Sequence, residues 1–198
     1  MSSIESFFFS VEKVDQREGF SDEELVHLAC KQKGFEEKIQ QLLLDGFFYG
    51  GDTKSDSKAY TDMKEKKIYI GKKKSLEEAC LSLFYEMINA SNHKKFESIF
   101  ETFLKQSDLS NKRANEYALA ILRVEADALF EKCKYAEAMQ LEHLIKNPKY
   151  LEIYRNTKEN QEKVKELIFN EMVEHGTVHC GKKKAVDHYM EQYYSSSK

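Results

Sequence analysis

Apolar side chains recur at helical spacing along most of the chain, which predicts a mainly helical protein. Ser21 followed by Glu24 is the signature of a helix-capping box, and apolar positions continue from there towards Asp45. Gly34 predicts a break within this first helical stretch. Further helices are predicted at 75–92, 94–106, 110–140 and 158–175, with a short one near 182–194 and breaks at Pro148, Gly176 and Gly181.

The pattern changes between residues 46 and 71. Aromatic and glycine residues at 46–51, a polar run at 52–58 and β-prone residues at 59–71 predict a small antiparallel element that turns near Lys64 and Glu65. The fold class is therefore mainly α, as an α+β protein with a minor sheet. We expect one domain over 1–198. It has an N-terminal helical part at 1–45, the β element at 46–71, and a helical core with C-terminal helices at 72–192.

Composition limits the possible partners and the compartment. The chain has 34 acidic and 31 basic side chains, so it has no net basic charge and nucleic-acid binding is not expected. No apolar run approaches the roughly 20 residues of a membrane span, and the first residues lack the pattern of a secretory signal. Cys80 and Cys133 lie in helical patterns without a CxxC motif, which indicates buried thiols in a reducing, cytoplasmic compartment.

The predicted helix 75–92 carries the first candidate for chemistry. Ser75 and Glu78 form a second capping-box signature directly after the predicted strand at 67–70. Residues 83–90 read Leu-Phe-Tyr-Glu-Met-Ile-Asn-Ala, and this segment resembles the active-site helix of zincin metallopeptidases, aliphatic-x-His-Glu-x-x-His-Ala. The resemblance implies a general-base role for Glu86, with Tyr85 and Asn89 at the positions of the two zinc-binding histidines.

The replacement of both histidines changes the expected metal chemistry. A neutral carboxamide at Asn89 is a poor zinc ligand, and the phenol of Tyr85 binds metal only after losing a proton with an ordinary pKa of about 10. We therefore predict no bound zinc and no other cofactor. The alternative interpretation of 75–92 is an ordinary amphipathic helix whose polar side, including Ser82 and Asn89, faces solvent.

Glu125 interrupts the apolar stripe of the predicted helix 110–140. A carboxylate among apolar residues must find a partner or keep its proton, because an unpaired buried charge costs several kcal/mol. In one zincin branch a glutamate on the helix after the active-site helix is the third zinc ligand. By that resemblance, Tyr85, Glu86, Asn89 and Glu125 should line one cleft beside the strand at 67–70. The alternative is a structural bond from Glu125 to a tyrosine, to Arg123 or to a backbone amide.

A second cluster lies near the C-terminus. His175 and His179 are four residues apart, Cys180 follows, and Glu171 and Glu174 precede them. This pattern suits a metal site or a cysteine–histidine nucleophile pair. Gly176 predicts instead that the helix ends between the two histidines.

Two lysine runs, 72–74 and 182–184, are each followed by a helix. They suit phosphate groups or an acidic protein partner, and the alternative is that they are solvated surface residues.

The function that follows from these patterns is binding to a partner protein by a degenerate zincin-like domain. The lysine-rich composition is similar to that of effectors that intracellular bacteria deliver into host cells, which would place the chain in the host cytosol. The first alternative is an active metal-dependent hydrolase that uses Glu86 as general base, completed by Glu125 and residues 175–180. The second is a plain helical interaction module.

Overall fold

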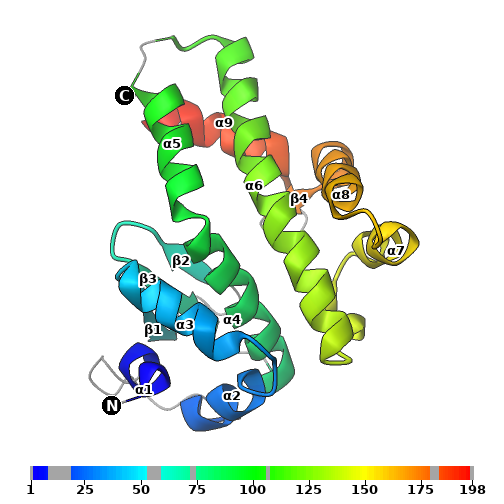
Figure 1. The fold of residues 1–198 in the computed structure, drawn as a ribbon. Helices are drawn as coiled ribbons and strands as arrows, with labels where there is room; N and C mark the ends of the chain where they lie inside the picture. Colours follow the sequence, from blue (N-terminus) through cyan, green and yellow to red (C-terminus); the bar gives the residue numbers. More distant parts are fainter. Residues whose placement is uncertain are drawn as a thin grey trace. The chain divides into compact units, whose positions relative to one another are not determined.

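The computed structural model describes residues 2–8, 19–52, 59–71, 75–105, 108–178 and 183–196. They form two compact units. The first unit comprises Met1–Ser91 and Lys134–Ile145, and the second comprises Asn92–Cys133 and Lys146–Lys198. The longest helix, α6 (Asn111–Ala138), begins in the second unit and ends in the first (Figure 1). That the two units act as one domain over 1–198 stays a prediction.

Three helices open the first unit: α1 (Ser3–Phe8), α2 (Asp22–Ala29) and α3 (Phe35–Leu44). The predicted capping box begins α2, because the Ser21 hydroxyl accepts from the Glu24 backbone amide and the Glu24 carboxylate accepts from the Ser21 amide. The predicted break at Gly34 is confirmed: this glycine has φ 82°, a left-handed conformation, and directly precedes α3.

The sheet of the first unit has the order β1-β3-β2, with β1 (Phe48–Asp52), β2 (Tyr60–Asp62) and β3 (Lys67–Ile70). The predicted antiparallel hairpin is confirmed for β2 and β3, whose turn at 63–66 is closed by the Asp62 carboxylate accepting two backbone hydrogen bonds. The sheet as a whole is mixed, because β1 pairs with β3 in parallel. The strand β2 lies on the far side of β3, at the edge of the sheet, so β3 lies directly beside β1. The two strands run in the same direction.

Helix α4 (Leu76–Ser91) forms the centre of the first unit. It starts at the predicted capping box of Ser75 and Glu78, whose two reciprocal hydrogen bonds are 3.3 and 3.2 Å long. The helix contacts β2, β3, α2 and α3, and every residue from Ala79 to Ala90 except Tyr85 is buried. The interpretation of 75–92 as an amphipathic helix with a solvated polar side is therefore wrong.

The second unit contains α5 (His93–Leu104), most of α6, α7 (Pro148–Thr157), α8 (Gln161–His175), the short strands β4 (Thr177–Val178) and β5 (Lys183–Lys184), and α9 (Ala185–Ser196). A short 3-10 turn, η1 (Glu142–Leu144), belongs to the first unit. The predicted helices near 94–106, 110–140, 158–175 and 182–194 match α5, α6, α8 and α9. Their core includes the buried Tyr117, whose ring is packed by Phe100, Phe103 and Tyr193.

Pro148 was expected as a break, yet it is the first residue of α7. The Asn147 side chain caps this helix by accepting from the Lys149 amide at 3.0 Å. Proline is favoured at a first helical position, because its ring fixes a helical φ and its missing N–H has no partner there in any case.

Among the described helices, none has both the length and the apolar composition needed to cross a bilayer.

Candidate functional site

Glu86 lies inside the first unit and is hydrogen-bonded there. Its side chain is only 7% exposed. The hydroxyl of Thr61, on β2, lies 2.9 Å from Glu86 Oε2 and 3.0 Å from the Glu86 backbone oxygen. Since a hydroxyl has one hydrogen, Thr61 donates to one of these two acceptors at a time. Thr61 thus connects the outer strand of the sheet to the centre of α4.

The two residues at the positions of the zincin histidines differ in environment. Asn89 is 8% exposed and donates from Nδ2 to Glu86 Oε2 at 3.4 Å. Its buried Oδ1 has no hydrogen-bond partner within the part of the chain that the structure describes. Tyr85 is half-buried. The carboxamide of Asn89 therefore presents its N–H group to Glu86, where a zinc-binding histidine would present a lone pair to a metal.

Glu125 lies in the second unit and is bonded to a tyrosine. It is half-buried on α6, and it accepts a 2.5 Å hydrogen bond from the hydroxyl of Tyr189 on α9. Tyr150, on α7, is also close: burial raises its pKa, and the negative charges of Glu171 and Glu125 raise it further. The alternative of a structural bond from Glu125 to a tyrosine is thus the arrangement observed. That Glu125 shares a cleft with Tyr85, Glu86 and Asn89 stays a prediction.

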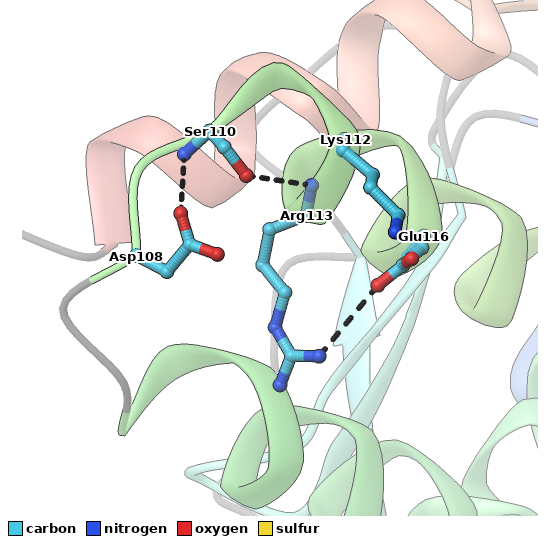
Figure 2. Close-up of a pocket in the computed structure, with 5 residues that line it drawn as sticks. All are labelled: Asp108, Ser110, Lys112, Arg113 and Glu116. Carbon is cyan, nitrogen blue, oxygen red and sulfur yellow. Dashed lines mark hydrogen bonds and ion pairs between the residues drawn. The ribbon is translucent and has the colours of Figure 1, made fainter.

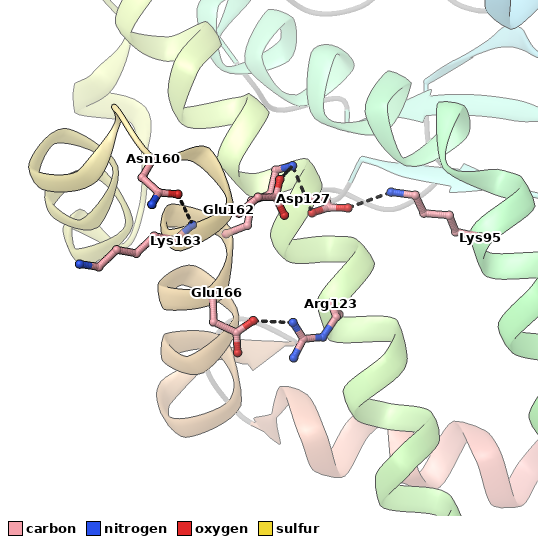
Figure 3. Close-up of polar contacts among 8 residues, drawn as sticks. Lys95, Arg123, Asp127, Asn160, Glu162, Lys163 and Glu166 are labelled. Atoms are coloured by element: carbon pink, nitrogen blue, oxygen red, sulfur yellow. Dashed lines mark hydrogen bonds and ion pairs between the residues drawn. The ribbon is translucent and has the colours of Figure 1, made fainter.

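Arg123, the other partner considered for Glu125, pairs elsewhere. Its guanidinium donates to Glu166 of α8 at 2.5 Å and lies over the ring of Phe169, 4.1 Å from the ring centroid. Figure 3 shows this pair beside a second set of contacts, in which Asp127 of α6 lies 2.8 Å from Lys95 of α5. These pairs connect α6 to α5 and to α8, and because they are exposed each contributes little to stability.

The C-terminal cluster is described only in part. His175 is the last residue of α8, and its exposed imidazole lies 3.6 Å from Glu174. The predicted end of the helix at Gly176 is confirmed. His179 and Cys180 lie outside the described residues. In the described ranges, no group of three or more histidine, cysteine, aspartate and glutamate side chains is arranged to hold a metal ion.

The lysine runs are also covered incompletely. Residues 72–74 and Lys182 lie outside the described part of the chain. Lys183, on β5, forms an ion pair with Glu191 of α9. This lysine is therefore held by its own unit.

A pocket of about 230 Å³ at the start of α6 was not predicted (Figure 2). Its polar groups bond to one another: the Ser110 backbone amide donates to the Asp108 carboxylate at 2.8 Å, and the Arg113 guanidinium lies 3.6 Å from the Glu116 carboxylate. The Arg113 guanidinium also donates to the Thr102 carbonyl at 2.7 Å. The signal in the sequence was Asp108 and Ser110 directly before a helix, which is a capping pattern. The residues that line the pocket therefore cap the start of α6.

Two tyrosines on the sheet form a second feature that was not predicted. Tyr60 of β2 and Tyr69 of β3 are opposite each other in register, and their rings stack with centroids 4.9 Å apart. Tyr60 remains 45% exposed. A Cβ atom added at Gly50 would lie 2.6 Å from the Tyr69 ring, so glycine at this position makes room for the ring. The sequence feature that indicates this pair is the alternation of side chains along each strand. It places Tyr60 and Tyr69 on the face opposite to that of Thr61 and Ile68.

No family model, curated protein or solved structure matches this chain.

Proposed function

We propose that the protein acts by binding another protein, and that residues 85–89 do not carry out hydrolysis. The observation that carries this proposal is the environment of Glu86, which is buried and hydrogen-bonded by Thr61 and Asn89. A general base must reach the proton that it removes, either directly or through one water molecule. In this structure Thr61 and Asn89 both donate to Glu86 Oε2, so this oxygen is engaged in contacts within the first unit.

The alternative of a metal-dependent hydrolase requires a different arrangement. Glu86 would have to face a metal-bound water, and the side chains at positions 85 and 89 would have to supply lone pairs to the metal. The Asn89 side chain instead donates its N–H group to Glu86, which supports the non-catalytic proposal. An ancestral relation to zincins accounts for the retained glutamate, and it is part of the proposal.

Exposed apolar side chains support the binding role. Leu44, at the end of α3, is 82% exposed, and Leu109 is 51% exposed. Covering such side chains gains about 25 cal/mol for each Å² of apolar surface removed from water. A partner that covers Leu44 would therefore gain free energy that the isolated chain does not. We propose delivery into a host cell, and binding in its cytosol, as the setting for this activity.

Two measurements test this function. For hydrolysis, wild type and Glu86→Gln are incubated with a mixed peptide substrate and added zinc, and we expect no Glu86-dependent cleavage. For binding, a photo-crosslinking amino acid replaces Leu44 and, as a control, the exposed Asn156. We expect a discrete crosslinked partner from position 44 that unlabelled wild type competes away, and none from position 156. Cleavage that disappears in Glu86→Gln would overturn the proposal.

A further inference from the structure

The outer face of the small sheet presents the stacked pair Tyr60 and Tyr69. Because side chains alternate along a strand, Thr61 and the buried Ile68 face α4, and the two tyrosines face the other way. Neither phenol hydroxyl has a hydrogen-bond partner among the described residues. The pair therefore offers an aromatic surface with two unused polar groups.

The residues between Tyr60 and Tyr69 carry charges of both signs, and the carboxylates among them act on the two phenols. Burial raises the pKa of Tyr69, and the carboxylates of Asp62 and Glu65 raise it further. The pKa of Tyr60 is raised by burial, by Tyr69 and by Asp62. Lys67 is opposite Asp62 in register, and no ion pair joins either of them to another described residue. A cation placed over the Tyr60 ring would have the Asp62 carboxylate on the same face of β2, two residues along the strand.

The strand β2 is at the edge of the sheet. Within the described residues β3 is its sheet neighbour, on one side. An edge strand is the kind of element to which an extended segment of another chain adds, in recognition by strand addition. Because β2 has only three residues, backbone hydrogen bonds alone would give little affinity, and the side chains beside the edge must supply the rest.

We propose that Tyr60, Tyr69 and Asp62 form a docking surface for an extended segment of a partner protein that carries an arginine. The proposal rests on the binding function above and names the surface and the partner's chemistry. An arginine guanidinium is planar, so it can stack on the Tyr60 ring while donating to the Asp62 carboxylate. A lysine ammonium lacks this planar face, and a glutamate would meet Asp62 and Glu65 with like charge.

The test uses short, capped serine- and threonine-rich peptides that differ only in the central residue. That residue is arginine, its uncharged isostere citrulline, or glutamate. Binding is followed by amide and tyrosine-ring chemical shifts of the full-length protein. We expect shifts centred on residues 60–69 and an affinity for the arginine peptide that is about tenfold above that for citrulline, the size of a cation–π contact with its ion pair.

Three variants locate the site. Tyr60→Ala removes the exposed ring, Asp62→Asn removes the charge but keeps an acceptor for the turn, and Gly50→Ala displaces the Tyr69 ring. Each should lower the affinity for the arginine peptide about fivefold or more, whereas Leu109→Ala, an exposed residue of the second unit, should not. The amide spectrum of each variant shows whether it is folded.

The outcomes separate the two proposals. Equal affinities for the three peptides, tighter binding of the glutamate peptide, or binding unchanged in folded Tyr60→Ala overturn the docking surface. If the crosslink from position 44 persists in Tyr60→Ala while the peptides do not bind, the binding function stands and only this surface falls. If neither the peptides nor a crosslinked partner are observed, the binding function falls as well.

Discussion

Among single residues, Thr61 links a strand to a helix through one hydroxyl group. Replacing it by valine keeps the shape and the β-branch but removes the donor at the buried Glu86 carboxylate. We expect Thr61→Val to lower the free energy of unfolding by about 1–3 kcal/mol in urea melts, the cost of leaving a buried polar group short of a donor.

Thr102→Val is a matched control. The Thr102 hydroxyl donates to the Ser98 carbonyl of its own helix, and the residue is exposed. This change should stay within about 0.5 kcal/mol of wild type. If Thr61→Val is no more destabilising than Thr102→Val, the hydrogen bond to Glu86 contributes nothing measurable.

Glu125 and Tyr189 allow a second comparison of single residues. Glu125→Gln keeps an acceptor for the Tyr189 hydroxyl and most of the shape, so we expect a small effect on unfolding. Glu125→Leu removes the acceptor and should cost about 1–3 kcal/mol. In a double-mutant cycle, Tyr189→Phe should abolish most of the extra cost of Glu125→Leu, because the hydroxyl is then absent. Additive effects would mean that Glu125 is held by other contacts.

The contacts of these two glutamates mark the limit of prediction from sequence. The apolar stripe around Glu125 indicated that it needs a partner, and a tyrosine was among the candidates. The actual donor is 64 positions away along the chain, on α9. Thr61 reaches Glu86 because of the strand register and the packing of β2 against α4. Neither pairing follows from local spacing, since both depend on how separate elements pack.

Among the elements, those with local signals were predicted well. The capping boxes at Ser21 and Ser75, the break at Gly34 and the hairpin turn at 63–66 depend only on neighbouring residues. Helix α7 was missed because Pro148 was read as a break, although a first helical position tolerates proline. The parallel pairing of β1 with β3 is a non-local choice that alternation within strands does not reveal.

For helix α4, the burial of its polar side could not be predicted from the sequence. Its periodicity identified which positions are polar, but it did not identify what covers them. Contacts with two strands and two helices enclose the helix, so Ser82, Glu86 and Asn89 are 7–8% exposed. Buried polar groups of this kind are usually satisfied by hydrogen bonds, as Glu86 is.

The end of α8 yields a prediction about backbone packing. A Cβ atom at Gly176 would lie 3.0 Å from the Met172 Cα and carbonyl carbon, and closer still to the Met172 carbonyl oxygen. Backbone atoms in a helix give way less readily than the end of a side chain. We therefore expect Gly176→Ala to lower stability by about 1–3 kcal/mol in thermal melts, with the adjacent, exposed Thr177→Ala near wild type. A neutral Gly176→Ala would show that the helix end relaxes freely.

At the level of the whole molecule, buried thiols predict how stability depends on pH. Burial raises the pKa of Cys133 from 9.0 to about 12, and burial raises that of Cys80 to about 11. In the unfolded chain these thiols lose their protons near pH 9, whereas in the folded chain they keep them to higher pH. Stability from this source is fully present below pH 9 and is lost as pH rises towards 11–12, by about 1.4 kcal/mol per pH unit for each thiol.

Cys133→Ala isolates one of these contributions. At neutral pH the variant should be less stable than wild type, because it leaves a small cavity. The stability difference should then shrink as pH rises from about 9 to 11, because only wild type loses stability through this thiol. Urea melts across that range measure the difference. A constant difference would mean that Cys133 titrates in the folded chain as it does in the unfolded chain.

The metal content of the purified protein tests the reading of the whole chain as a degenerate zincin. Tyr85 would have to give up its phenol proton and Asn89 would have to turn its N–H group away from Glu86 before a zinc ion could bind there. We therefore expect elemental analysis of protein purified without chelators to find far less than one zinc per chain. Stoichiometric zinc that disappears in Tyr85→Phe would restore the hydrolase alternative, in which Glu86 is the general base and not a metal ligand. Zinc that survives Tyr85→Phe but disappears in His175→Ala would place a metal site at the C-terminal cluster and leave residues 85–89 without a metal.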